Sequence, residues 1–518
     1  MNRIIIIGAG PAGLTAGCEL AEKTEGSEII ILEGSDTAGG ISRTVCVDGN
    51  RMDMGGHRFF SKNEDVMNWW KELMPVQGSP SYDDCILGRP YEICEGGPNP
   101  EIEDTVFLKR NRVSRIYYRK HFFDYPVTMN VATVKNLGLG TTLCAGFSYL
   151  KAMIFRRREN SLEDFYINRF GRKLYSTFFE GYTEKLWGRH PREISPDWGA
   201  QRVKGLSIMA VLKDIFHKLV HLEKKDTETS LIESFYYPKY GPGQLWEAAA
   251  SRFQSRGGRI MYGCRVKQVC IKDGRVRSVI YKKDGNEYEI EADAVFSSMP
   301  VKDLAAGMDN MPEDIKNIAE GLPYRDFVTV GLLVDRLLLK NETDTRTLGD
   351  IVPDCWIYVQ DKGIRMGRIQ IFNNWSPYMV EDPEHKVWIG LEYFCNENDR
   401  MWNMSEEEWL EMGTSELVTM GILESNARVE TYHCEKVQKA YPAYFDTYED
   451  IDRLEKWLNN VDGLYCIGRN GQHRYNNMDH SMLTAMEAVR VYCGQEQDKS
   501  VIWKVNTEKE YHEEEKRN

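Results

Sequence analysis

The sequence predicts an α/β protein with a parallel sheet, and two observations near the amino terminus carry this prediction. Residues 4–7 and 29–32 are short runs rich in isoleucine, which are typical of strands buried on both faces of a parallel sheet. Residues 14–23 between them place apolar side chains at helical spacing. The chain has 518 residues, 42% of them hydrophobic and 28% charged. This length is enough for about two to four globular domains.

A glycine motif joins the first strand to the helix. Residues 8–13 read Gly-Ala-Gly-Pro-Ala-Gly. Gly8 permits a tight turn, Gly10 lets the backbone approach a pyrophosphate, and Gly13 lets the helix pack closely on the strand. The free N–H groups at the start of the helix favour phosphate. Glu33, twenty residues past Gly13, ends the second strand and can accept hydrogen bonds from ribose hydroxyls. Together these features predict a dinucleotide site.

The residues that follow distinguish FAD from NAD. Residues 39–43 hold a glycine pair and an arginine, so that Gly40 and Arg43 can lie along the far side of a pyrophosphate. This extension is similar to that of FAD proteins of the glutathione-reductase and amine-oxidase type. A second pair, Gly55 and Gly56, precedes His57 and brings the backbone close to a flat, bulky group. FAD is therefore the predicted cofactor.

Further parts of the same domain are expected far along the chain. Residues 257–269 begin a strand set that continues as an antiparallel meander, and Val266 in it is a candidate FAD contact. The same domain is also expected to contain a strand at 294–297, a strand at 463–468 and a helix at 483–491. The expected division is a discontinuous Rossmann-like FAD-binding domain of residues 1–62, 235–301 and 440–495, a mostly helical inserted substrate region at 63–234, a second inserted α+β substrate region at 302–439, and a charged tail at 496–518.

One apolar run in the first insertion needs an explanation. Residues 136–150 carry no charge and are flanked by Lys135 and Lys151. Their number falls short of the roughly 20 residues that span a bilayer. We therefore expect a buried helix and no membrane span.

Composition excludes other classes of protein. The formal net charge of -13 offers no basic excess for phosphates along a duplex, so nucleic acid is not an expected partner. The twelve cysteines are scattered and have no metal-ligand spacing, so no metal is expected. Thiols in this pattern suit a reducing compartment, and we expect a cytoplasmic protein.

Four segments resemble one family of flavoproteins. The first is the Gly-Gly-His of residues 55–57. The second is the sequence Tyr-Thr-Glu-Lys-Leu-Trp-Gly of residues 182–188. The third, between 468 and 481, contains Gly468, Arg469, Arg474, Tyr475 and Asp479, and a looser fourth is residues 368–375. The chain thereby resembles UDP-galactopyranose mutase, within the amine-oxidase and protoporphyrinogen-oxidase-like superfamily, and the third segment is implied to bind the flavin.

The resemblance implies a redox-neutral reaction on reduced FAD. N5 of the flavin attacks the anomeric carbon of a UDP-hexose, and the sugar interconverts between pyranose and furanose forms, with NADPH or NADH as the flavin reductant. Arg368 and Arg202 are implied to neutralise the diphosphate, since guanidinium suits phosphate oxygens. Tyr182 and Trp187 would form one wall of the sugar-nucleotide cleft. His57 would set the electronics of the flavin through a hydrogen bond.

Several alternatives remain open on the sequence. Trp187 could be a core aromatic residue, Arg202 a surface ion-pair partner and Asp479 a helix cap. The chain could instead be an FAD oxidoreductase of the amine-oxidase, protoporphyrinogen-oxidase or desaturase kind, with net hydride transfer to the flavin. A flavin-binding scaffold without catalysis is a third possibility, and the sequence does not identify the sugar.

Overall fold

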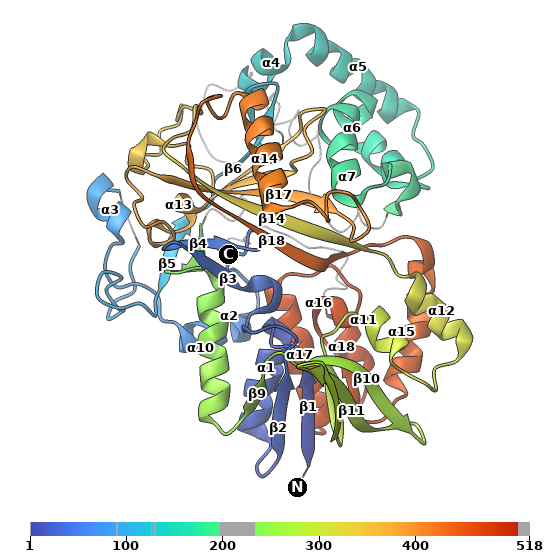
Figure 1. The fold of residues 1–518 in the computed structure, drawn as a ribbon. Helices are drawn as coiled ribbons and strands as arrows, with labels where there is room; N and C mark the ends of the chain where they lie inside the picture. Colours follow the sequence, from blue (N-terminus) through green and yellow to red (C-terminus); the bar gives the residue numbers. More distant parts are fainter. Residues whose placement is uncertain (1, 90–91, 126, 128–130, 197–233, 506–518) are drawn as a thin grey trace.

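The computed structural model describes residues 2–505 except 90–91, 126, 128–130 and 197–233. A five-stranded parallel sheet forms the lower half of the molecule in Figure 1. Its strands, in spatial order, are β19 (Leu464–Cys466), β13 (Ala294–Ser297), β1 (Arg3–Ile7), β2 (Glu28–Leu32) and β9 (Arg259–Met261). They come from the beginning, middle and end of the chain, which confirms the predicted α/β class and its discontinuous sheet.

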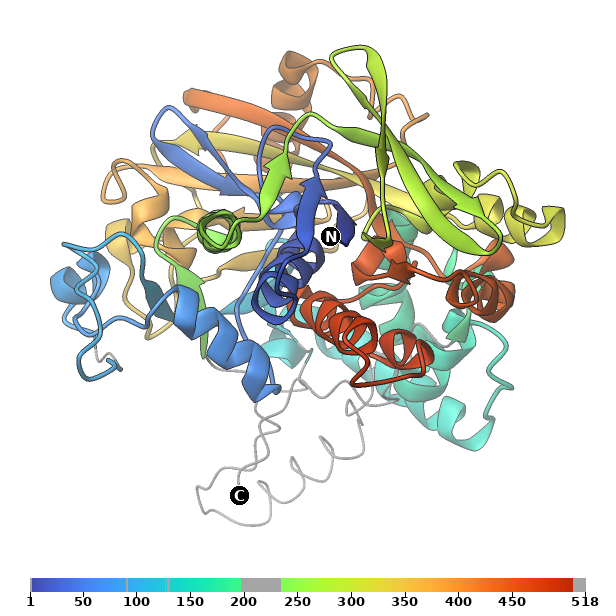
Figure 2. The same ribbon diagram turned by 90° about the horizontal axis from the view of Figure 1, so that it is seen from below.

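Helices and a second sheet cover the two faces of the parallel sheet. Helices α1 (Pro11–Lys23) and α17 (Met478–Tyr492) lie side by side on one face. The antiparallel meander of β10 (Arg265–Lys272), β11 (Arg275–Lys283) and β12 (Asn286–Glu291) lies on the other (Figure 2). Because both faces are covered, the isoleucines of β1 and β2 are buried, as their composition predicts.

Strand β9 differs from the sequence-based expectation. The sequence placed residues 257–260 at the start of the antiparallel meander, whereas β9 pairs in parallel with β2, with Ile31 opposite Ile260. Helix α10 (Pro242–Ser255) directly precedes β9. A chain that returns to the sheet through a helix enters it in the parallel direction.

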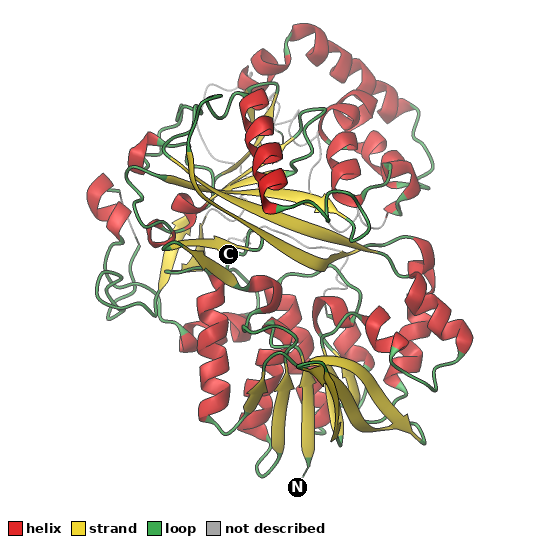
Figure 3. Cartoon of the chain, in the orientation of Figure 1, coloured by secondary structure: helices red, strands yellow, loops and turns green. Residues whose placement is uncertain are grey.

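A seven-stranded mixed sheet forms the second half, clearest in Figure 3. All its neighbours are antiparallel except β15 and β6. Strands from both inserted regions meet in it. In spatial order they are β18 (Val429–Pro442), β14 (Tyr324–Val334), β17 (Val387–Cys395), β16 (Arg368–Ile371), β15 (Trp356–Val359), β6 (Ser114–Tyr118) and β7 (His121–Asp124).

The two faces of the mixed sheet have different neighbours. On one face, Val328, Val330 and Leu391 pack in a cluster with Trp409 of α14 (Glu406–Met420). On the other face, alternate residues of the same strands carry polar side chains and large aromatic rings. Because side chains alternate along a strand, the register of β14, β17 and β16 decides which groups share that second face.

Helix α5 (Leu139–Ile154) confirms the predicted helix but not its burial. It packs against α6 (Leu162–Phe178), where the kink at Gly171 brings the two backbones together near Tyr149. Only Ala145, Tyr149 and Ala152 of α5 are buried. The expectation of a buried helix is wrong for its outer side, because α5 lies at the outer end of the molecule (Figure 1). Across the described residues, no helix combines the length and apolarity needed to cross a membrane.

The remaining elements flank one of the two sheets or lie between the two halves. They are the hairpin of β3 (Thr44–Val47) and β4 (Asn50–Asp53), the pair β5 (Phe107–Asn111) and β8 (Ser234–Pro238), and the helices α2 (Glu64–Leu73), α3 (Tyr82–Leu87), α4 (Val131–Leu137), α7 (Glu180–Trp187), α11 (Val301–Ala306), α12 (Glu313–Gly321), α13 (Phe372–Trp375), α15 (Ile451–Asn459), α16 (Gly468–Gly471) and α18 (Ser500–Lys504).

Candidate functional site

Three turns meet at the carboxyl edge of the parallel sheet. Gly8 follows β1, Ser298 follows β13 and Gly468 follows β19, and these strands are neighbours. Ligands of open α/β sheets bind at this edge. A Cβ on Gly8, whose φ is 96°, would overlap the Ser298 hydroxyl, and a Cβ on Gly13 would overlap the carbonyl oxygen of Gly8. The glycines therefore allow the close packing that the sequence predicts.

No side chain caps the start of α1. Gly10 is its N-cap and offers no side chain for the first N–H groups, which leaves them available to an anion. Gly40, with a φ of 56°, brings its turn against Gly10, since a Cβ there would lie 3.2 Å from the Cα of Gly10. Arg43 donates to the carbonyl of Gly40 at 3.1 Å and forms an ion pair with Glu435 at 2.9 Å. Its guanidinium thus ties this turn to β18.

Glu33 organises the neighbouring loop. Its carboxylate accepts hydrogen bonds from the N–H of Ala9 at 2.6 Å and of Ser35 at 2.8 Å. Its own carbonyl accepts one from the N–H of Cys264 at 2.7 Å. Val266 lies two residues further along, at the start of β10, and is buried. Glu33 and Val266, both predicted to contact FAD, therefore lie near each other although they are far apart in sequence.

The third family-like segment packs against the glycine motif. The N–H of Gly468 donates to the hydroxyl of Thr484 at 2.7 Å, and a Cβ on Gly468 would lie 2.8 Å from that of Ala12. Helix α16 therefore begins beside the start of α1. Arg474 points elsewhere, because its side chain donates to the carbonyl of Trp503 in α18 at 3.0 Å.

Asp479 lies in the first turn of α17 but is not its cap. The N-cap residue is Asn477. Asp479 is buried and accepts a hydrogen bond at 3.0 Å from Ser61. Ser61 follows closely on Gly55, Gly56 and His57, so this bond joins the first family-like segment to the third.

The Gly-Gly-His segment faces the mixed sheet. Gly55 has a φ of 106°, and a Cβ on Gly56 would lie 3.3 Å from the ring of Trp375. Burial, with the positive charges of Arg469 and Arg368, lowers the pKa of His57 to about 4. The ring is therefore neutral at neutral pH, and its Nδ1 has no hydrogen-bond partner among the described residues.

Arg368 is the centre of a polar cluster on β16. It stands opposite Glu392 of β17 and forms an ion pair with that buried carboxylate. Gln370 donates to Glu392 at 2.8 Å, and Arg368 donates to the hydroxyl of Tyr441 at 2.8 Å. The Arg368 side chain remains 19% exposed. Glu392 keeps it charged, since the carboxylate holds the pKa of Arg368 well above its ordinary value against the opposing effect of burial.

Four tyrosines surround this cluster. The rings of Tyr182 and Tyr358 meet edge to face at 5.7 Å, and those of Tyr441 and Tyr475 stack at 5.6 Å. The guanidinium of Arg469 lies 4.1 Å from the ring of Tyr475. Burial raises the pKa of Tyr182 well above its ordinary value and that of Tyr441 to about 12. Tyr182 and Tyr441 are therefore protonated at neutral pH, and their hydroxyls can donate hydrogen bonds.

Helix α7, which carries the second family-like segment, is firmly anchored. Lys185 donates to the carbonyls of Val359 at 3.1 Å and of Asp361 and Met366 at 3.2 Å. Trp187 is 2% exposed and packs edge-on to Phe445 at 6.3 Å. Trp187 is thus part of the hydrophobic cluster beneath α7. Arg202 lies outside the described residues.

Several of these groups were not predicted. Glu392, Tyr441, Tyr358 and Lys185 were missed because their roles depend on strand register and on long-range packing. Glu392 had one signal in the sequence: it is the lone carboxylate of the apolar run 387–395. A carboxylate buried in such a strand needs a cation partner.

The residues present suit a flavin. Thr329 Oγ1, Gln370 Oε1, Arg469 Nε and His57 Nδ1 are buried and have no hydrogen-bond partner within the described part of the chain. Thr329 lies in the same cross-strand row as Glu392 and Glu435, between Arg368 and Arg43. Buried polar atoms without partners are rare in folded proteins unless a ligand or water satisfies them. A ring with several donors and acceptors, next to two glycine turns whose free N–H groups suit a pyrophosphate, meets this requirement.

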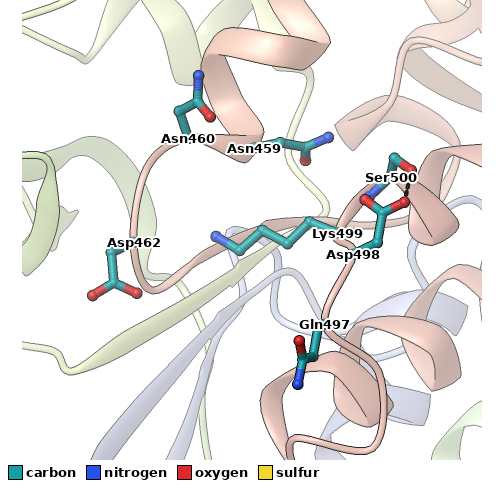
Figure 4. Close-up of a pocket in the computed structure, with 7 residues that line it drawn as sticks. All are labelled: Asn459, Asn460, Asp462, Gln497, Asp498, Lys499 and Ser500. Carbon is teal, nitrogen blue, oxygen red and sulfur yellow. Dashed lines mark hydrogen bonds between the residues drawn. The ribbon is translucent and has the colours of Figure 1, made fainter.

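A hollow elsewhere on the surface does not share these features. It measures about 420 Å³ and is lined by polar residues near the carboxyl end of the described chain (Figure 4). Lys499 crosses it and donates to the carbonyls of Val461 at 2.7 Å and Leu464 at 3.1 Å. Its ammonium therefore links the segment of Lys499 to the segment that enters β19. None of the predicted site residues lines the hollow.

A discontinuous parallel sheet with this glycine motif and this second glycine-rich turn defines a dinucleotide-binding flavoprotein. The sequence of residues 11–491 matches the family of flavin containing amine oxidoreductases, and the chain belongs to that family. It is therefore an FAD-dependent enzyme.

Individual relatives are more distant. A dTDP-fucopyranose mutase of Escherichia coli is 28% identical over 198 residues, which are 38% of this chain and 44% of that mutase. The chain thus matches less than half the length of this curated relative. The crystal structure of a reduced UDP-galactopyranose mutase aligns over 98% of this chain and 99% of its own, with 20% identity and a TM-score of 0.75. A putative protoporphyrinogen oxidase from Exiguobacterium sp. 255-15 aligns over 95% and 99%, with 15% identity and a TM-score of 0.64. These two structures share the fold.

Proposed function

We propose that the protein is an FAD-dependent sugar-nucleotide mutase, which interconverts the pyranose and furanose forms of a hexose linked to UDP or a similar nucleotide. The observation that carries the proposal is the charged, partly exposed Arg368. It is held by Glu392 and surrounded by phenols, beside the Gly-Gly-His segment. The likeness to two mutases supports it.

Arg368 would neutralise the diphosphate of the substrate. Among the described contacts, Glu392 and Tyr441 use two of the five N–H donors of its guanidinium, so that the others can donate to phosphate oxygens. Arg469 adds a second positive charge close by. Arg202 remains a proposed third cation. As the sugar separates from the diphosphate, negative charge grows on the phosphate, and fixed cations stabilise that charge.

The cofactor site would be built from the glycine turns. The start of α1 at Gly10 and the turn at Gly40 would hold the pyrophosphate, and Glu33 the ribose. The backbone of Gly55 and Gly56 would face the flavin ring. When bound and reduced, FAD supplies at N5 the nucleophile for the anomeric carbon of the sugar.

The phenols and His57 would set the environment of the reacting sugar. Tyr182 and Tyr441 stay protonated and can donate hydrogen bonds to sugar or phosphate oxygens. His57 is neutral at working pH, so it adds no charge beside the flavin, and its ring can form one hydrogen bond with it. We further propose NADPH or NADH as the reductant and the cytoplasm as the location, where the twelve unpaired cysteines are stable.

The test is a direct assay of interconversion. Purified protein with bound FAD is reduced without oxygen and incubated separately with UDP-galactofuranose and dTDP-fucofuranose, and the products are separated by anion-exchange chromatography. We expect the pyranose isomer to form with at least one of the two, and oxidised protein to be inactive. Absence of product from both, with flavin fully bound and reduced, would contradict the proposal.

Net oxidation is the second candidate, because the family is named for amine oxidoreductases. In that case a substrate would bleach the flavin without NADPH or NADH, and hydrogen peroxide would form when air is admitted. Nucleotide sugars should cause no such bleaching if the mutase proposal is correct.

A further inference from the structure

The outer side of α5 carries a continuous apolar stripe, which we call the α5 stripe. Successive members are three or four residues apart, so they share one side of the helix. This side lies roughly opposite Ala145, Tyr149 and Ala152, which pack on α6. The stripe consists of Leu139, Leu143, Phe147, Leu150 and Ile154, which are 73%, 61%, 72%, 53% and 73% exposed. Stripes of this kind on a protein surface mark an interaction site.

Positive charge surrounds the stripe. Between Asp124 and Glu159 the sequence contains no acidic residue and five basic ones, although the whole chain has a net charge of -13. The five are Lys135, Lys151, Arg156, Arg157 and Arg158, all of them exposed. The helix ends in Ile154. Phe155, which follows it and precedes the three arginines, is another exposed apolar residue, 69% exposed. Apolar residues and cations thus occupy the same small surface.

We propose that the α5 stripe docks this enzyme on the surface of an anionic lipid bilayer. A helix that lies in the membrane interface buries apolar side chains at the boundary of headgroups and acyl chains, while lysine and arginine beside them contact the lipid phosphates. The α5 stripe, with Lys151 and the arginines beside it, has this composition.

The placement of α5 suits such docking. At 1.5 Å per residue, the segment from Leu139 to Ile154 is roughly 22 Å long, and it would lie flat rather than cross the bilayer. Helix α5 is at the end of the molecule farthest from the parallel sheet (Figure 1), so the sheet and its glycine turns stay clear of the membrane.

Charge also argues against a second copy of the chain as the occupant. A twofold contact through the stripe would place two sets of five cations near each other. The segment between Asp124 and Glu159 supplies no carboxylate, and within the described contacts only Arg157 of the five is paired, with Asp164 at 3.2 Å. An anionic surface removes this repulsion, and rising salt should weaken the attachment.

The test uses the full chain with bound FAD and vesicle co-sedimentation. The vesicles are phosphatidylcholine alone, or phosphatidylcholine with about one third phosphatidylglycerol. We expect binding to the anionic vesicles, weaker binding to the neutral ones, and a loss of about tenfold or more for the variant L143Q/F147Q. Replacing Arg156 and Arg158 by Gln should weaken binding about fivefold for each cation removed.

Controls separate docking from misfolding and from self-association. Tyr288→Gln removes a 45% exposed aromatic ring from β12 in the other half and should bind vesicles like the wild type. Flavin absorbance and thermal unfolding should be unchanged in every variant. The proposal fails if wild type does not bind anionic vesicles, or if L143Q/F147Q binds them equally well. It also fails if sedimentation velocity shows a dimer that L143Q/F147Q dissociates. None of these outcomes depends on the sugar-nucleotide assay.

Discussion

Arg368 and Glu392 show how one residue can serve both stability and chemistry. The carboxylate is 1% exposed, and among the described residues the guanidinium of Arg368 and the amide of Gln370 compensate its burial. Arg368→Met should lower the interconversion rate by roughly 100-fold or more, since a fixed donor to developing charge is lost. It should also cost about 3–5 kcal/mol of stability, because the buried carboxylate is left unpaired. Product formation and urea unfolding measure the two effects.

A double variant separates the two roles. Arg368→Met with Glu392→Gln removes the unpaired charge, so most of the stability should return while activity stays low. Arg336→Met is the matched control, because Arg336 pairs with Glu424 in an exposed position, with its side chain 74% exposed. Full activity in the double variant would show that Arg368 does not act on the substrate.

His473 is expected to make stability depend on pH. Its ring is fully buried, contacts the carbonyl of Ala443 at 2.9 Å, and has its pKa lowered by burial from 6.5 to about 4. Between these values the unfolded chain binds the proton and the folded chain does not, so stability is intact above pH 6.5 and falls as the pH is lowered toward 4. The loss should reach roughly 3 kcal/mol.

The measurement is urea unfolding of wild type and His473→Gln at several pH values. The amide of Gln can replace the bond to Ala443 but does not titrate, so the variant should lose less stability between pH 6.5 and 4. Parallel curves for the two proteins would contradict the assignment to His473.

Among the elements, the turn between β1 and α1 is the most sensitive to substitution. A Cβ on Gly13 would overlap the carbonyl oxygen of Gly8, so Gly13→Ala must displace the start of α1. We expect bound flavin, measured by visible absorbance against protein, to fall by about tenfold or more, because the phosphate-binding N–H groups move. Gly34→Ala, close by but with open space around it, should keep its flavin. Equal flavin content in both variants would refute the role of the turn.

Helix α7 depends on Lys185 for its position. Its ammonium donates to three carbonyls of the segment between β15 and the start of β16, which carries Arg368. Lys185→Met leaves these carbonyls without that partner and should cost roughly 3 kcal/mol of stability. Urea unfolding measures the loss, with the exposed Lys173→Met of α6 as control. A loss no larger than that of the control would mean that α7 is held by other contacts.

Local signals predicted some elements well and others poorly. The segment from β1 to β2 was predicted because strand composition, the glycines and helical spacing all agree within thirty or so residues. The exposure of α5 was not, because an apolar stripe has the same spacing whether it is buried or exposed. The pairing of Arg368 with Glu392 could not be predicted, since the two residues are 24 positions apart and the register of their strands decides the pairing.

At the scale of the whole molecule, bound FAD should stabilise the entire fold. The turns at Gly8 and Gly40 meet the turn at Gly468, from a distant part of the sequence, around the start of α1. Protein stripped of flavin should therefore gain about 2.7 kcal/mol when FAD is present at 100 times its dissociation constant. Thermal unfolding with FAD, and with NAD as control, measures the gain. An equal shift with NAD would contradict the predicted preference for FAD.

The sequence indicated which parts of the chain share the parallel sheet, but not how the insertions combine. Residues 294–297 and 463–468 were assigned to the nucleotide-binding half because each is a short apolar run followed by small residues. That β6 and β7 join the strands of the second insertion could not be seen, because β6 contacts β15 across more than 200 residues of sequence. The composition of the mixed-sheet face that carries Arg368 could not be predicted for the same reason.

Strands that are neighbours in the parallel sheet are synthesised at very different times. β1 leaves the ribosome well before β13 beside it, and β19 at the edge of the sheet is made later still. At roughly 5–20 residues per second, the nascent amino-terminal strands wait some tens of seconds for these neighbours. During that interval their isoleucine-rich edges are open to wrong pairing. Folding helpers that shield nascent chains should therefore affect the yield of this protein more than that of one whose sheet is contiguous in sequence.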